Sequence, residues 1–210
     1  MDKNLTSILT VHAETAKKRL EERQFECTIV QDEKEALELI QSMIKAGDSV
    51  SVGGSQTLFE TGVIDYLENN IEITYLDRYH TDDPHQVFRA AFSADVYLTS
   101  TNALTMDGKL VNVDGNGNRV AAMIYGPKKV IVLAGINKLV KDEEAAVERI
   151  KNIAAPANCV RLNKDTPCTK IGRCADCLSK GRICASHVTQ DRSQTKGRIH
   201  VILMMQEAGY

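Results

Sequence analysis

Two hydrophobic periodicities alternate along the chain. Short apolar runs rich in β-branched residues predict strands, and they cover residues 25–30, 49–52, 71–76, 95–99, 129–134 and 198–205. Between them, apolar residues three or four positions apart predict a first helix capped by Asn4 or Thr6 and further helices within residues 32–47, 63–68, 82–92, 119–125 and 142–156. This alternation predicts an α/β fold, a doubly wound, mostly parallel sheet with helices on both faces.

Glycine and asparagine concentrate between Ala94 and Val120. The strand over residues 95–99 ends in small polar residues. A tight turn is then expected at residues 106–108, a strand at residues 109–113 and a second turn at residues 114–118. We therefore expect an inserted β-hairpin. Its turns can reflect hairpin geometry alone, or backbone left accessible to a ligand.

Composition and charge narrow the classes of function. The chain has 210 residues, 43% of them hydrophobic, which predicts a single domain over residues 1–210 with an N-terminal helix over 1–24 and a cysteine-rich loop over 164–190. A formal charge of −2 and an aromatic content of 5% without Trp argue against nucleic acid as a partner.

The sequence shows no apolar run of about 20 residues and no apolar signal segment, so we expect a cytoplasmic protein without membrane contact. A homodimer is the default expectation.

Small and polar residues follow four of the predicted strands, at residues 53–57, 77–80, 100–102 and 135–138. In an open parallel sheet the ligand lies outside the carboxyl ends of the strands, so these groups are expected to converge on one crevice. The run from Gly53 to Thr57 also joins a strand to a helix, an arrangement that favours anion binding through backbone N–H groups. An ordinary turn remains the alternative.

The candidate ligand-binding residues come from this crevice and from the hairpin. They are Gly53, Gly54, Ser55 and Thr57, which would hold an anion, and Thr101, Asn102, Asp107 and Asn112, which would line the opposite wall and orient it. An acid or base role for Asp114 or His80 is a further option, although no pairing in the sequence supports it.

Four of the six cysteines lie close together near the C-terminus. Cys168, Cys174, Cys177 and Cys184 have the spacing C-x5-C-x2-C-x6-C, and His187 follows as an alternative ligand that could replace Cys168. Because cytosolic thiols stay reduced, this density favours a metal centre, either zinc or a [4Fe–4S] cluster. A reduced loop packed on the domain, or a redox pair, are the alternatives.

The other two cysteines are interpreted as structural. Cys27 alternates with apolar neighbours in the first strand, and Cys159 is placed in a short predicted strand.

Several segments together resemble the lactate-utilisation (LUD-domain) family. They are GGS at residues 53–55, STNALTMDGKLVNVDGNGNRVA at 100–121, GPKKVIVLAGINKLV at 126–140 and the TPC…GxCxxC run at 166–177. The resemblance implies a fold similar to the isomerase/coenzyme A-transferase group, which binds sugar phosphates or coenzyme A thioesters. It also implies a supporting role in the oxidation of L-lactate to pyruvate, beside iron–sulfur partner proteins.

Three hypotheses follow for function. The first is a domain that binds a small anionic, phosphorylated or carboxylate, ligand. The second is a non-catalytic metal-bearing subunit that passes electrons or docks partners; the chain lacks the C-x2-C-x2-C-x3-C-P run of ferredoxin-like modules, so a ferredoxin role is not implied. The third is a ligand-sensing or interaction module with a purely structural cysteine loop.

Overall fold

A computed structural model describes residues 2–210 of the chain. It contains a parallel six-stranded sheet with the strand order β1-β10-β7-β4-β2-β3, so the most apolar strand lies in the interior of the sheet. The strands are β1 (Glu26–Val30), β2 (Ser49–Val52), β3 (Thr74–Leu76), β4 (Val96–Thr99), β7 (Lys129–Gly135) and β10 (Ile199–Met204). The predicted doubly wound parallel sheet is confirmed.

Helices cover both faces of this sheet because its strands are apolar on both sides. In β7, Val130 and Val132 face one core and Ile131 and Leu133 face the other. The first core takes side chains from α1 (Lys3–Glu22) and α6 (Asn118–Tyr125), and the second takes them from α2 (Glu33–Met43), α3 (Gln56–Glu60) and α4 (Val63–Asn69). Parallel strands that are buried on both faces are expected to be continuously hydrophobic.

A second, smaller sheet has the order β8-β5-β6-β9. The predicted hairpin forms its centre, with β5 (Ala103–Thr105) antiparallel to β6 (Leu110–Asp114). β8 (Leu139–Val140) and β9 (Ser186–Gln190) complete it, so the chain beyond the cysteine-rich segment returns to pair with the hairpin. The sequence did not predict these two outer strands, because their pairing partners are distant in the chain.

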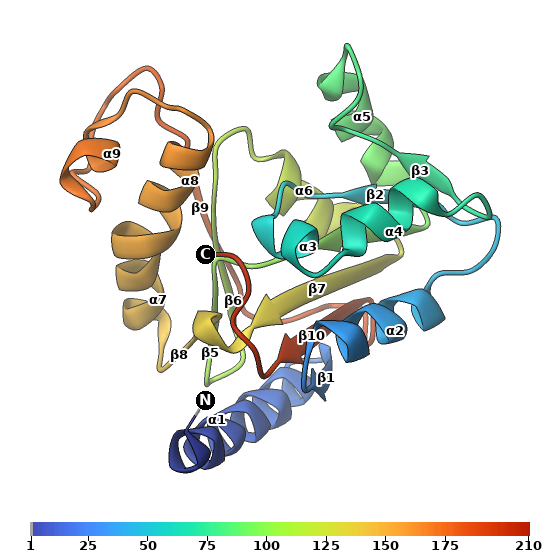
Figure 1. Ribbon diagram of the computed structural model, residues 1–210, viewed down its shortest axis with the longest axis horizontal. Coiled ribbons are helices and arrows are strands. Elements are labelled where there is room, and N and C mark those ends of the chain that lie inside the picture. Colours follow the sequence, from blue (N-terminus) through green and yellow to red (C-terminus); the bar gives the residue numbers. More distant parts are fainter. Residues whose placement is uncertain (1) are drawn as a thin grey trace.

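The remaining helices occupy the two ends of the molecule. Figure 1 shows α5 (Pro84–Ala90) at one end and α7 (Glu143–Arg149), α8 (Ala155–Arg161) and α9 (Pro167–Ile171) together at the other. A small third core joins α7 to the hairpin through Ala146, Ile150, Ala103 and Val111. No helix among residues 2–210 is both long and apolar enough to cross a membrane.

Three local expectations were wrong. The first helix is capped by Asp2, whose carboxylate accepts from the backbone N–H of Asn4 at 3.0 Å. Pro156 does not end a helix, because a π-helical turn (Ile150–Ala154) precedes it and Pro156 then lies in the first turn of α8, where a missing N–H costs little. Cys159 is consequently buried in α8 and not in a strand.

Candidate functional site

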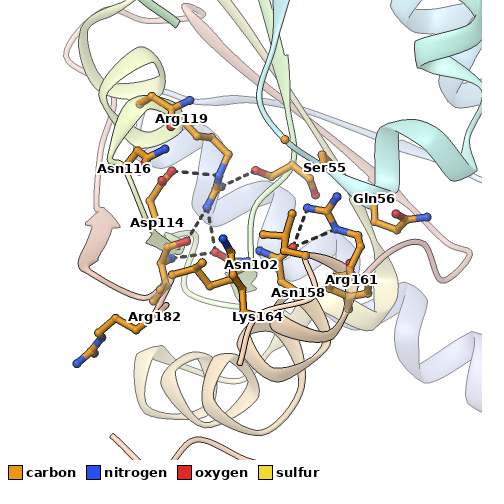
Figure 2. A pocket seen from close by; sticks show the side chains of 18 of the residues that line it. Ser55, Gln56, Asn102, Asp114, Asn116, Arg119, Asn158, Arg161, Lys164 and Arg182 are labelled. Atoms are coloured by element: carbon orange, nitrogen blue, oxygen red, sulfur yellow. Dashed lines mark hydrogen bonds and ion pairs between the residues drawn. The ribbon is translucent and has the colours of Figure 1, made fainter. Parts of the chain in front are cut away.

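A cavity of about 500 Å³ opens at the carboxyl ends of the strands. Its wall takes Gly54, Ser55 and Gln56 from the start of α3, Ser100 to Asn102 from the end of β4, and Lys138 from the turn after β7. α8 and the cysteine-rich segment close the opposite side (Figure 2). The cavity therefore lies between the main sheet and the end of the molecule that carries α7 to α9.

Positive charge dominates this cavity. Seven of its lining residues are cationic and one is a carboxylate, Asp114, although the whole chain has 26 Lys and Arg against 28 Asp and Glu. Within residues 2–210, five of the seven have no carboxylate within 4.0 Å: Arg78, Lys138, Arg161, Lys164 and Lys180. A group of cations without internal counter-ions favours an anionic ligand.

Arg119 is the most firmly held of the cations, and the polar residues of the hairpin hold it. Its guanidinium donates to Asn112 Oδ1 at 2.6 Å and to Asn102 Oδ1 at 3.1 Å. Asp114 Oδ2 lies 3.4 Å from Arg119 Nε, and the arginine side chain is only 11% exposed. Figure 2 shows Arg119 between Asp114 and Asn102 at the back of the cavity. The arrangement fixes a buried positive charge in one orientation.

Lys138 is the most deeply buried cation on the wall, with 2% of the residue exposed. Its Nζ donates to Thr57 Oγ1 at 2.8 Å and to Ser100 Oγ at 3.0 Å, and both partners are neutral. Burial lowers the pKa of Lys138 to about 7, and the positive charges of Arg149 and Arg119 act in the same direction. The amine is therefore about half neutral near physiological pH.

Asp114 supplies the one negative charge of the wall. Its Oδ1 accepts from the backbone N–H of Gly117 at 3.0 Å, which fixes the turn after β6. Its Oδ2 is buried and accepts no hydrogen bond in the described part of the chain, although Arg119 lies nearby. Because this oxygen is shielded from solvent, its negative charge acts mainly on the guanidinium of Arg119.

Comparison with known proteins identifies the family. A sequence model of the LUD domain matches residues 13–204. The chain belongs to the LUD domain family. This family is associated in general with lactate utilisation. No curated protein sequence matches the chain.

Comparison with solved structures shows one whose fold is similar over nearly the whole chain. The domain is similar to the crystal structure of a DUF162 family protein from Deinococcus radiodurans, with a TM-score of 0.54 and 14% identity over 93% of this chain and 98% of that chain. It is also similar, with a TM-score of 0.39 and 12% identity over 54% of this chain and 44% of that chain, to eIF2B beta from Chaetomium thermophilum.

The LUD domain brings four of the eight predicted ligand-binding residues to the cavity wall: Gly54, Ser55, Thr101 and Asn102. Three others lie directly behind the wall. Thr57 and Asn112 are buried and accept from Lys138 and Arg119, and a Cβ on Gly53 would lie 2.9 Å from Cγ of Arg119. These three residues therefore position the cations and do not face the ligand space.

Two predicted residues lie outside the cavity. Asp107 does not line it, contrary to expectation, because the hairpin turn extends toward α1, where Arg23 Nε donates to Asp107 O at 2.7 Å. His80 also lies outside, where its Nδ1 is 2.7 Å from Asp77 Oδ2 and 3.7 Å from Glu68 Oε1. The hydrogen bond to Asp77 raises the pKa of this exposed histidine.

The cysteine-rich segment forms part of the cavity wall through Lys180 to Ile183. Arg182 stabilises the loop, because its guanidinium donates to Cys177 O at 2.6 Å and to Cys184 O at 2.9 Å. The cysteine-rich segment therefore places the positive charges of Lys180 and Arg182 at the cavity, whether or not its cysteines bind a metal.

The predicted cysteine ligands are not assembled as a tetrahedral set. Among residues 2–210, no three of Cys168, Cys174, Cys177, Cys184 and His187 have ligand atoms within 4.8 Å of one another. Cys168 is buried, and its sulfur forms a hydrogen bond of 3.2 Å with Thr166 Oγ1. The arrangement does not fit a preformed metal centre, so a bound zinc ion or cluster stays a prediction.

The sequence analysis placed Lys138 at the crevice within the group 135–138, but it named neither Lys138 nor Arg119 as a ligand-binding residue. Lys138 lies three residues beyond the end of β7, and Arg119 follows the glycine-rich turn. Arg161 and Lys164 gave no signal in the sequence, because α8 and the residues after it reach the cavity only through tertiary packing.

Proposed function

We propose that this LUD domain binds a small organic molecule with at least one anionic group and a hydroxyl, such as a phosphorylated or carboxylate-bearing metabolite, in support of the oxidation of L-lactate to pyruvate. The observation that carries this proposal is a set of four cavity cations that have no carboxylate partner among residues 2–210: Arg78, Arg161, Lys164 and Lys180. A cavity of about 500 Å³ is within the range of small-molecule sites, roughly 300–1,000 Å³.

The wall suggests how such a ligand would be oriented. Arg161 and Lys164 lie on the outer, solvent-exposed side, and Arg119 lies at the back (Figure 2). An anionic group would be attracted to these cations, while the exposed side-chain amide of Asn116, which also lines the cavity, would hydrogen-bond with a hydroxyl on the same molecule. This combination favours a hydroxy acid or a sugar phosphate over a simple inorganic anion.

Calorimetric titration with inorganic phosphate, pyrophosphate, L-lactate and pyruvate tests the proposal. Replacing Arg161 by Gln should weaken binding of the tightest anion by about tenfold or more, because a charged hydrogen bond contributes roughly 1.5–3 kcal/mol. Arg89→Gln is the matched control, since Arg89 is exposed on α5 and does not line the cavity.

The outcomes separate the hypotheses. Binding that falls with added salt and with Arg161→Gln, but not with Arg89→Gln, supports the anion site. Absence of binding for all four anions, or equal affinities for both variants and the unmodified protein, would exclude it. Conversion of a bound anion to a product would distinguish an enzyme from a ligand-sensing module.

A further inference from the structure

The two hydroxyl groups that contact Lys138 Nζ indicate a chemical role for this amine. The inference rests on the anion site proposed above. Thr57 Oγ1 donates to Ala208 O at 3.2 Å, and Ser100 Oγ donates to Thr101 O at 3.4 Å. Each hydroxyl therefore has a backbone carbonyl within reach of its hydrogen. With its hydrogen on that carbonyl, each hydroxyl accepts from Lys138 Nζ.

This geometry has a consequence for the neutral amine. A neutral lysine has two N–H hydrogens and one lone pair, and the two hydroxyls can accept both hydrogens. In that arrangement the lone pair has no donor among the two hydroxyls. Because Lys138 lines the cavity, a group bound there lies next to its side chain.

We propose that Lys138 is a nucleophile that condenses with an aldehyde or ketone group of an anionic ligand in this cavity. The Nζ lone pair forms a bond to the carbonyl carbon, and the electron pair of the C=O bond moves to its oxygen. The two amine hydrogens then leave with that oxygen as water, and an imine remains. No oxidant or reductant is needed, since the step exchanges C=O for C=N.

The surroundings of Lys138 support this role at neutral pH. The charged groups that face it are Arg149 on α7, Arg119 on α6 and, with the opposite effect, Glu60 on α3. Arg149 is fixed by donating to Asn102 O at 2.7 Å and to Asn137 O at 2.9 Å, so its positive charge stays close. Burial, with the positive charges of Arg149 and Arg119 in addition, therefore favours the neutral amine, and Arg119 also lines the anion site.

Reductive trapping tests this proposal. The full-length protein is incubated with pyridoxal 5′-phosphate, a phosphate-bearing aldehyde, and then treated with borohydride, which converts an imine to a stable amine. We expect one adduct, mapped to Lys138 by peptide mass spectrometry and reduced by excess inorganic phosphate. Pyridoxal, which lacks the phosphate, should label it at least tenfold more slowly. The same procedure with pyruvate examines an α-oxo acid.

The pH dependence distinguishes Lys138 from an ordinary lysine. With a pKa of about 7, labelling should fall by roughly 50-fold from pH 7 to pH 5 and level off above pH 8. An amine with the usual pKa of about 10.4 would continue to gain about tenfold per pH unit in this range. A rate at Lys138 that keeps rising through pH 9 would overturn the proposal.

Two variants complete the test. Lys138→Met should abolish the adduct, while Lys34→Met, at an exposed position on α2 outside the cavity, should retain the adduct at Lys138. Thermal unfolding of both variants verifies that they fold. If phosphate binds but only Lys164 or Lys180 is labelled, the nucleophile is refuted and the anion site stands. If phosphate does not bind and Lys138 is not labelled, both proposals fail.

Discussion

Replacing Lys138 by Met should change how the stability of the protein depends on pH. Met keeps the length of the side chain but removes the titratable amine. In the folded protein the pKa of Lys138 is lowered to about 7, mainly by burial, from 10.5. The folded state therefore releases a proton that the unfolded state still holds between these two pH values.

The sign and size of the effect follow from this difference in bound protons. Below pH 7 both states hold the proton, and the folded state carries the full penalty of a buried charge, about 5 kcal/mol for a shift of this size. Between pH 7 and 10.5 the unfolded state binds more protons, so stability rises with pH by about 1.4 kcal/mol per unit. The penalty is absent above pH 10.5.

Urea unfolding of both proteins between pH 6 and pH 9 measures this dependence. Subtracting the Lys138→Met free energy removes contributions that the two proteins share. We expect the difference, unmodified protein minus variant, to be flat from pH 6 to 7 and to rise by about 2–3 kcal/mol from pH 7 to 9. A difference that stays constant, or that falls as pH rises, would show that Lys138 keeps its proton in the folded state over this range, and it would refute the reasoning.

Three further predictions concern the support of the site and the thiols. Gly53→Ala should destabilise the protein by about 1–3 kcal/mol in urea unfolding, because the added methyl would lie 2.9 Å from Cγ of Arg119. Asn112→Ala should cost a similar ~1–3 kcal/mol and weaken phosphate binding, since it removes the 2.6 Å hydrogen bond to Arg119. Iodoacetamide should modify Cys177, whose pKa is lowered by a serine hydrogen bond, before Cys159, whose pKa is raised by burial to about 11.

Matched controls accompany these measurements. Gly181→Ala should be neutral, because its nearest neighbour lies 3.8 Å from the added methyl, and Asn4→Ala should be neutral because Asn4 is exposed and does not line the cavity. Equal losses at Gly53 and Gly181 would contradict the packing argument. If the cysteine segment binds a metal, Cys177 of protein purified without oxygen will resist iodoacetamide until a chelator is added.

Local sequence patterns determined the parallel sheet and its helices. Alternating strand and helix periods place apolar residues on both sides of each strand, and burial of those residues is what forms the two cores. The ends of the strands could also be predicted from the sequence. For this reason the predicted ligand-binding residues include four that line the cavity: Gly54, Ser55, Thr101 and Asn102. Each of these inferences depends on residues close together in the sequence.

Only the tertiary structure decided which side chains face the cavity and how far burial and neighbouring charges shift their pKa values. Asn112 was expected to orient a ligand, but the return of the hairpin places it against Arg119. The environment of Lys138 is assembled from segments around Thr57, Ser100 and Arg149, so burial and charge act on it through residues distant in the chain. Desolvation and Coulomb interactions depend on distances in space, and sequence periodicity does not encode those distances.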